Sequence, residues 1–151
     1  MTDVVEPFVP VGFEPPAGLD TPAFRLRPLA PVHNVSDYAA WTSSMEHIHA
    51  TPGWEDSTWP RPMTLEENRG DLERHAADFV NRAGFTYTVL APDSDEVVGC
   101  VYMYPAKEGG GAAVLSWVRA ASADLDGPLY IAVSSWLTRD WPFSRFVYAP
   151  R

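Results

Sequence analysis

Three strand-like segments lie close together in the middle of the chain, and their short links limit the fold more than any other feature. The segments are 85–91 ("FTYTVLA"), 97–105 ("VVGCVYMYP") and 112–120 ("AAVLSWVRA"). The links between them, "PDSDE" and "AKEGGG", are rich in turn-forming residues. Parallel neighbours need a crossover of about a dozen residues or more, which neither link can supply. The sequence therefore predicts an antiparallel meander.

The residues before the meander predict one strand and a first helix. Apolar and basic residues alternate in 24–29 ("FRLRPL"), which is the period of a half-buried strand. Apolar side chains from Tyr38 to Ile48 then recur at helical spacing. Ser36 or Asn34 can cap the start of this helix, which should end near "ATPG".

A second helix is expected in the segment 64–84, "TLEENRGDLERHAADFVNRAG". Thr64 and Glu67 have the spacing of a capping box, in which each side chain satisfies a backbone donor at the helix start. Gly84 suits the left-handed position that follows a helix.

One further helix and one strand should follow the meander. Asp126 or Gly127, together with Pro128, opens the helix, and Pro142 ends it. The last strand is 145–150, "RFVYAP". The chain therefore belongs to the α/β (α+β) class, with a mixed, mostly antiparallel central sheet flanked by helices in the order β-α-α-β-β-β-α-β.

Charge and cysteine content exclude several kinds of function. The formal net charge of -9 argues against a nucleic-acid partner and against anionic membrane surfaces. The single cysteine, Cys100, cannot form a disulfide within the chain or build a cysteine metal site, and it is expected to be a small buried hydrophobe. No metal site is expected: the two rings of "HIH", His47 and His49, would point apart on a helix.

The N-terminal 22 residues differ in composition from the rest. They contain five prolines and four acidic residues, which predicts a Pro-rich arm (1–22) before a domain formed by 23–151. The start has no basic region and no long apolar stretch, so neither a signal peptide nor a membrane span is expected, and a cytoplasmic location is inferred. Lys107 is the only lysine beside many arginines and alanines, which indicates a GC-rich bacterial genome.

The order of elements, with "SWVRA" placed before a helix, resembles the core of the GNAT acetyltransferase family over residues 23–151. The resemblance implies an acetyl-CoA cofactor, held where the strand 112–120 splays from the last strand. The pantetheine arm would pair with the backbone of Trp117 and Val118, and the pyrophosphate would meet Arg119 and Ser122. The alternatives to these cofactor-binding roles are that Trp117 belongs to the core and that Arg119 is a solvated charge at the end of the strand.

Two departures from the family pattern concern this cofactor. The family loop runs Gln or Arg, two residues, Gly, one residue, and Gly or Ala, whereas Ser122 and Asp124 occupy the two small-residue positions here. Asp124 would repel a pyrophosphate. The Asp126 side chain is expected to cap its own helix and to use the backbone N–H donors that a phosphate would need. The family also continues beyond the point where this chain ends. Acetyl-CoA binding is therefore expected to be weak or absent.

Candidate acceptor and catalytic residues lie elsewhere in the chain. Trp54 and Trp59 in "TPGWEDSTWPRP" can form an aromatic wall for an amine, or they can cap the core. Glu46 or His47 can take the proton from an attacking amine, and Tyr148 can protonate the leaving thiolate.

A second tyrosine is a candidate general acid, and two histidines are given no functional role. Tyr104 is an alternative to Tyr148 as the general acid, and both are more commonly strand aromatics. His33 and His75 are interpreted as surface residues.

Two functions follow from these observations. The first is an acetyl-CoA-dependent N-acyltransferase acting on a small amine. The alternative is a catalytically degraded GNAT-fold protein that serves as a binding or structural partner. The expected partners are a small-molecule amine and, if the chain forms a homodimer, a second copy of itself.

Overall fold

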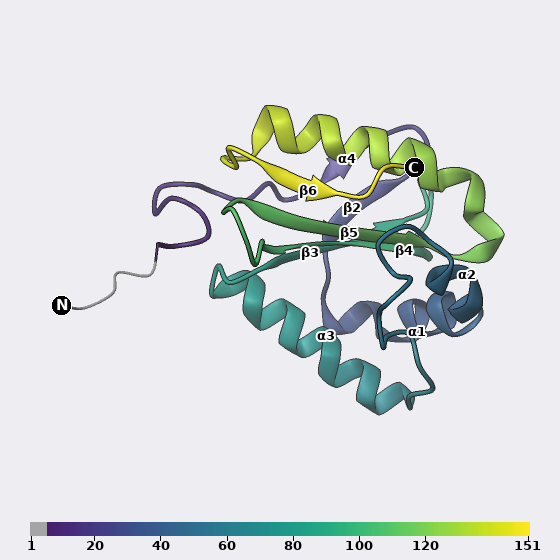
Figure 1. Ribbon diagram of the computed structural model, residues 1–151. Helices are drawn as coiled ribbons and strands as arrows, with labels where there is room; N and C mark the ends of the chain where they lie inside the picture. Colours follow the sequence, from purple (N-terminus) through teal and green to yellow (C-terminus); the bar gives the residue numbers. More distant parts are fainter. Residues whose placement is uncertain (1–5) are drawn as a thin grey trace.

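The computed structural model describes residues 6–151 and contains one six-stranded sheet in the order β1-β2-β3-β4-β5-β6 (Figure 1). Neighbouring strands are antiparallel except for β5 and β6, which are parallel. The strands are β1 (Leu19–Asp20), β2 (Arg25–Pro28), β3 (Phe85–Leu90), β4 (Val97–Pro105), β5 (Ala112–Val118) and β6 (Phe146–Tyr148). The predicted meander is confirmed as β3-β4-β5.

The helices cover both faces of this sheet. One face carries α1 (Asn34–Thr42), α2 (Met45–His49) and α3 (Leu65–Val80), and the other carries α4 (Asp126–Asp140), as Figure 1 shows. Short 3₁₀ helices precede α1 (η1, Pro31–His33) and α4 (η2, Ala120–Leu125). Among residues 6–151, no helix is both long and apolar enough to cross a membrane.

The start of α1 differs from the sequence prediction. Neither Ser36 nor Asn34 caps it, because both side chains make tertiary contacts instead. The Ser36 hydroxyl accepts the Val97 N–H at 2.8 Å, and the Asn34 amide donates to the Leu65 carbonyl at 3.1 Å.

The two ends of α3 give one confirmation and one correction. The capping box of Thr64 and Glu67 is present, with N–H···O distances of 3.1 and 2.9 Å. The left-handed residue after the helix is Arg82, with φ 60°, and not Gly84. Gly84 has another role: a Cβ there would lie 2.2 Å from the Tyr104 ring, so the close packing of that ring needs a glycine.

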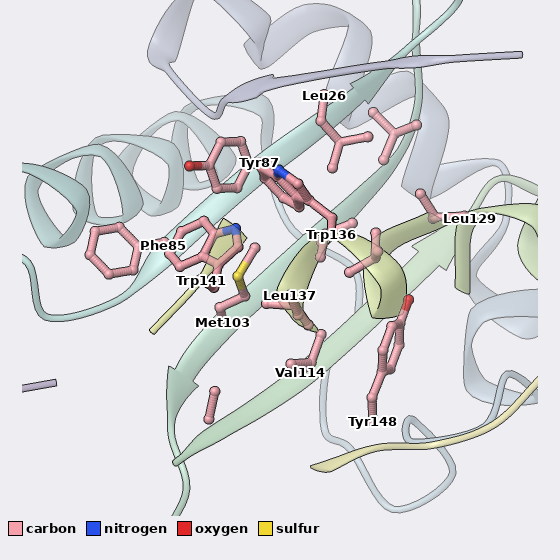
Figure 2. Close-up of a cluster of buried hydrophobic side chains, with 14 of the residues drawn as sticks. Leu26, Phe85, Tyr87, Met103, Val114, Leu129, Trp136, Leu137, Trp141 and Tyr148 are labelled. Atoms are coloured by element: carbon pink, nitrogen blue, oxygen red, sulfur yellow. The ribbon is translucent and has the colours of Figure 1, made fainter. Parts of the chain in front are cut away.

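Two hydrophobic clusters lie on the two faces of the sheet. The cluster beneath α4 is dominated by aromatic contacts, such as Trp136 with Tyr87 at 5.1 Å between ring centroids (Figure 2). The cluster beneath α1 and α3 contains Trp41, Trp117 and Cys100. Cys100 is fully buried, and burial raises the pKa of its thiol well above the usual range.

The described part of the N-terminal arm lies against the first cluster. Val9 is 1% exposed, and the Phe8 ring stacks on Phe85 and Phe143 at 5.8 and 4.9 Å. The Arg82 guanidinium donates to the Phe13 and Pro10 carbonyls. The arm therefore supplies part of the hydrophobic core.

Candidate functional site

The strands β5 and β6 pair only over their first residues and then separate. Ala112, Ala113 and Val114 of β5 face the three residues of β6, and β5 continues alone to Val118. The Arg119 N–H donates to Val98 of β4, so the alternation of an antiparallel ladder turns the N–H and C=O groups of Ser116 and Val118 away from β4. These groups border the gap that opens between β5 and the chain after β6.

The Arg151 side chain fills this gap. It is 4% exposed, and its guanidinium donates to the Ser116 carbonyl at 2.8 Å and to the Asp126 carboxylate at 2.7 Å. The Trp54 indole N–H also donates to the Ser116 carbonyl, at 2.9 Å. The carbonyl that a pantetheine arm would meet here already accepts two hydrogen bonds from the chain itself.

Tyr148 of β6 contacts the same point. Its hydroxyl lies 2.6 Å from the Ser116 hydroxyl, and burial raises its pKa to about 12. The side chain is therefore protonated at neutral pH and is bonded to Ser116. Figure 2 places Tyr148 at the edge of the cluster under α4, next to its strand partner Val114.

The loop after β5 is a 3₁₀ helix, and two of its N–H groups have partners outside a phosphate site. The Ala120 N–H donates to the Ser44 hydroxyl at 2.8 Å, and the Ser122 N–H donates to the Arg119 carbonyl at 2.9 Å. The Arg119 guanidinium bonds the Ser122 hydroxyl at 3.1 Å and pairs with Glu96. Arg119 and Ser122 are thus brought together as the sequence suggested, but they are bonded to each other and to Glu96.

The expectation that Asp126 caps α4 is wrong. Because η2 continues directly into α4, the Asp126 N–H already donates to Ala123, and the helix has no side-chain cap. The Asp126 carboxylate pairs with Arg151 instead, and its second oxygen is buried without a hydrogen bond from the described residues. Asp124 is exposed on the outside of η2.

Glu46 and His47 lie on α2, next to the start of η2. They border an open depression of about 380 Å³ together with Ser43, Ser44 and Ala120. Glu46 is exposed and His47 is half-buried. The structure places neither of them in the wall of the aromatic pocket described next.

Trp54 and Trp59 meet on the face of the sheet that carries α1 and α3. Their ring centroids are 5.3 Å apart, and Trp59 lies 6.1 Å from Trp117. Trp54 is 5% exposed, whereas Trp59 is half-buried. Trp117 is fully buried, and its indole N–H donates to the Tyr102 hydroxyl at 3.0 Å.

A half-open pocket of about 200 Å³ lies beside these rings. It is bordered by the long loop before α3 and by residues of α1, α3 and β4. Its lining residues are Leu29, Asp37, Trp54, Trp59, Asn68, Asp71, Leu72, Arg74, His75 and Tyr102. Both tryptophans that the sequence singled out therefore line one pocket, although Trp54 is also part of the core.

His75 lines this pocket and is not the surface residue that the sequence suggested. Its Nδ1 lies 2.8 Å from the Tyr104 hydroxyl, which donates to the Asp78 carboxylate at 2.8 Å. Nδ1 also lies 3.2 Å from the Thr86 hydroxyl. Because the Tyr104 proton goes to Asp78, we assign the proton of the neutral ring to Nδ1, which leaves Nε2 as an acceptor. Burial lowers the pKa of His75 to about 4, which keeps the ring neutral. The spacing of His75 and Asp78 on one helix face was the available sequence signal.

Asp37 is the second pocket residue that sequence reasoning missed. It is 4% exposed, and one carboxylate oxygen accepts from the Asn68 amide at 3.0 Å. Burial raises the pKa of this carboxyl to about 6. An acidic residue in the first turn of a helix is ordinary in sequence, so no local pattern indicates its burial.

Solved structures of the same fold are acetyltransferases. The ribosomal-protein-S5-alanine acetyltransferase from Vibrio fischeri is 13% identical, with a TM-score of 0.66 over 87% of this chain and 72% of that one. The microcin C7 self-immunity acetyltransferase MccE, solved with acetyl-CoA and AMP, is 14% identical, with a TM-score of 0.65 over 89% and 73% of the two chains. A chain from Bordetella pertussis assigned to the GNAT family is 18% identical, with a TM-score of 0.60 over 88% and 77%.

These likenesses confirm the fold that the element order suggested: the chain has the GNAT acetyltransferase fold. Sequence identities this low show a shared fold and do not show a shared activity. No family model and no curated protein sequence matches the chain.

Proposed function

We propose that this GNAT-fold chain is an acetyl-CoA-dependent N-acyltransferase acting on a small amine. The observation that carries the proposal is the gap between β5 and the chain after β6, where Ser116 and Val118 turn their backbone groups outward. Trp54 links this gap to the pocket, because its indole donates to Ser116 and its ring lines the pocket wall. A fold neighbour, MccE, was solved with acetyl-CoA.

The gap fits a pantetheine arm only after the Arg151 side chain leaves it. The Ser116 carbonyl then loses one of its two donors. The Val118 N–H points away from β4, as the Ser116 carbonyl does. In the η2 loop, the N–H groups of Ala120 and Ser122 already have partners and are not free for a pyrophosphate. Binding is therefore proposed to be weak.

Residues of this chain account for the remaining chemistry. When bound, acetyl-CoA supplies an activated thioester. The Val118 N–H, which points away from β4, would be the donor to the thioester carbonyl oxygen as it gains charge. Tyr148, protonated at neutral pH, is the proposed donor of a proton to the leaving thiolate.

Glu46 and His47 stay the candidates for the base that takes the ammonium proton, and His75 is proposed to orient the amine. His75 borders the pocket and burial lowers its pKa to about 4, so its neutral ring can accept a hydrogen bond from an amine that has already lost its ammonium proton. Glu46 and His47 border the depression at Ala120 instead. An amine held in the pocket would reach His75 first.

A second candidate function has its own supporting observation. Arg151 and η2 together occupy the cofactor position with internal hydrogen bonds, which favours a catalytically degraded GNAT-fold protein that binds a ligand without transferring a group. Both candidates use the aromatic pocket, and they differ in whether the gap ever opens.

Release of free CoA tests the first function directly. The full chain is incubated with acetyl-CoA and a panel of primary amines, and thiol release is followed together with the mass of the acetylated amine. Amine-dependent release that His75→Gln lowers by about a hundredfold supports the transferase. No transfer with any amine, from a folded protein that still binds amines, favours the second candidate.

A further inference from the structure

The pocket beside Trp59 contains a buried carboxylate without a cation. Asp37 is 4% exposed and takes part in no ion pair among residues 6–151. Within the described part of the chain, Arg74 is the one cationic side chain in the pocket lining, and it is paired with Asp71 at 3.1 Å. Burying a carboxylate in this way is unfavourable unless something else compensates its charge.

Only one of the two Asp37 oxygens is satisfied by the protein. Oδ2 accepts from the Asn68 amide, whose orientation is fixed by further bonds to Asn34 and to the Trp41 indole. Oδ1 accepts no hydrogen bond from the described residues, yet it is not sealed within the core as the free oxygen of Asp126 is. The pocket is the space that Asp37 lines.

The walls of the pocket complement a cation with an apolar body. Trp54 and Tyr102 meet edge to face at 5.6 Å, and Trp59 packs against Trp54 at 5.3 Å. Aromatic faces attract ammonium groups, and they also cover flat apolar surfaces. The groups that face Asp37 from α3 and β4 are Asp71, Arg74, His75, Cys100 and Tyr102, and none of them is a free cation.

We infer that this pocket binds a primary monoamine with an aromatic or similarly flat body, and that Asp37 is the counter-ion of its ammonium group. A volume of about 200 Å³ admits a small molecule of this kind. A single unpaired carboxylate matches one positive charge, which favours a monoamine over a polyamine. The inference deepens the proposed function by naming the class of acceptor, but the binding itself does not require acetyl transfer.

The test compares an amine with its neutral isostere. Phenethylamine and 2-phenylethanol are titrated into the full chain at pH 7.5, and tryptophan fluorescence and calorimetry record binding. Phenethylamine is expected to bind at least about tenfold more tightly than the alcohol. Asp37→Asn should remove this preference while leaving the affinity for the alcohol unchanged.

A matched control separates the pocket charge from the general negative charge of the protein. Asp95→Asn removes an exposed carboxylate that pairs with Arg25 outside the pocket, and it should bind phenethylamine as the native chain does. If Asp37→Asn does not fold, the native chain at pH 5 provides the second measurement. The amine should lose affinity there because Asp37 gains a proton, and the alcohol should not.

Three results would overturn the inference. They are equal affinity for the amine and the alcohol, equal phenethylamine affinity in Asp37→Asn and the native chain, and no binding up to about 10 mM. Amine binding through Asp37 without acetyl transfer would instead leave the inference standing and remove the transferase proposal.

Discussion

At the scale of single residues, Asp37 combines a stability penalty with a candidate binding role. Its pKa is raised from 3.8 to about 6, chiefly because burial disfavours the charged form. The folded protein therefore holds this proton more tightly than the unfolded chain does. The destabilising effect is absent well below pH 3.8, grows as pH rises, and is complete above about pH 6.

Asp37→Asn should accordingly stabilise the ligand-free protein at neutral pH. The pKa difference corresponds to an upper limit of about 3 kcal/mol, and we expect a gain of about 1–3 kcal/mol because an amide does not copy every carboxylate contact. Urea unfolding at pH 4 and pH 8 measures it. The variant should gain more at pH 8 than at pH 4, and a loss of stability at pH 8 would contradict the burial argument.

Arg119 supports a second prediction at this scale. Its guanidinium pairs with Glu96, so an anionic cofactor has to compete with that carboxylate. Arg119→Ala should weaken acetyl-CoA binding by about tenfold, and Glu96→Gln should strengthen it a few-fold by freeing the guanidinium. Both effects should shrink at high salt. Unchanged affinity in both variants would remove Arg119 from the cofactor site.

Residue roles were predictable from the sequence where the partner is local. The capping box of Thr64 and Glu67 depends on residues three apart and was predicted correctly. Asp126 was assigned the wrong role because its partner, Arg151, is 25 residues away. Asp37 and His75 were missed because their burial depends on elements that meet only in the folded chain.

At the scale of elements, the loop between α2 and α3 has a double role. Trp54 within it is almost fully buried and bonds the Ser116 carbonyl of β5. Trp59 is half-buried and contacts Trp41, Trp54 and Trp117. One tryptophan attaches the loop to the sheet, and the other presents a ring to the pocket.

Alanine at the two positions should therefore give different results. Trp54→Ala is expected to reduce the free energy of unfolding by about 3–5 kcal/mol, the usual range for a buried Trp. Trp59→Ala should be less destabilising and should weaken phenethylamine binding by about tenfold. Thermal melting and fluorescence titration separate the two effects. A large, equal loss of stability in both variants would show that neither ring serves a ligand.

The elements themselves were predictable to different degrees. The meander was predicted because short links leave antiparallel pairing as the only arrangement. The break between α1 and α2 was not, since Ser44 at the break bonds the Ala120 N–H across the molecule. The two-residue strand β1 gave no sequence signal because it is too short to show a period.

At the scale of the whole molecule, the two faces of the sheet have different tasks. The face under α4 is closed by the core and by the N-terminal arm, whereas the face under α1 and α3 holds the aromatic pocket (Figure 1). The gap at the end of β5 lies between them and is closed by Arg151. The proposed function requires that this gap accept acetyl-CoA when the Arg151 side chain is displaced.

The double variant Asp126→Asn with Arg151→Ala removes the Arg151 side chain from the gap and leaves no unpaired buried charge. These two residues form one ion pair, so removing only Arg151 would leave the Asp126 carboxylate unpaired beside the gap. The double variant therefore opens the gap at the lowest expected loss of stability, and its thermal melting is recorded first.

The deciding measurement is an acetyl-CoA titration of the native and double-variant proteins followed by amide NMR. We expect saturable shifts centred on Ser116 and Val118, with a native Kd weaker than about 0.1 mM that tightens by about tenfold in the variant. The absence of saturable shifts in both folded proteins would contradict the cofactor site, and tight native binding that the variant leaves unchanged would contradict its closure by Arg151.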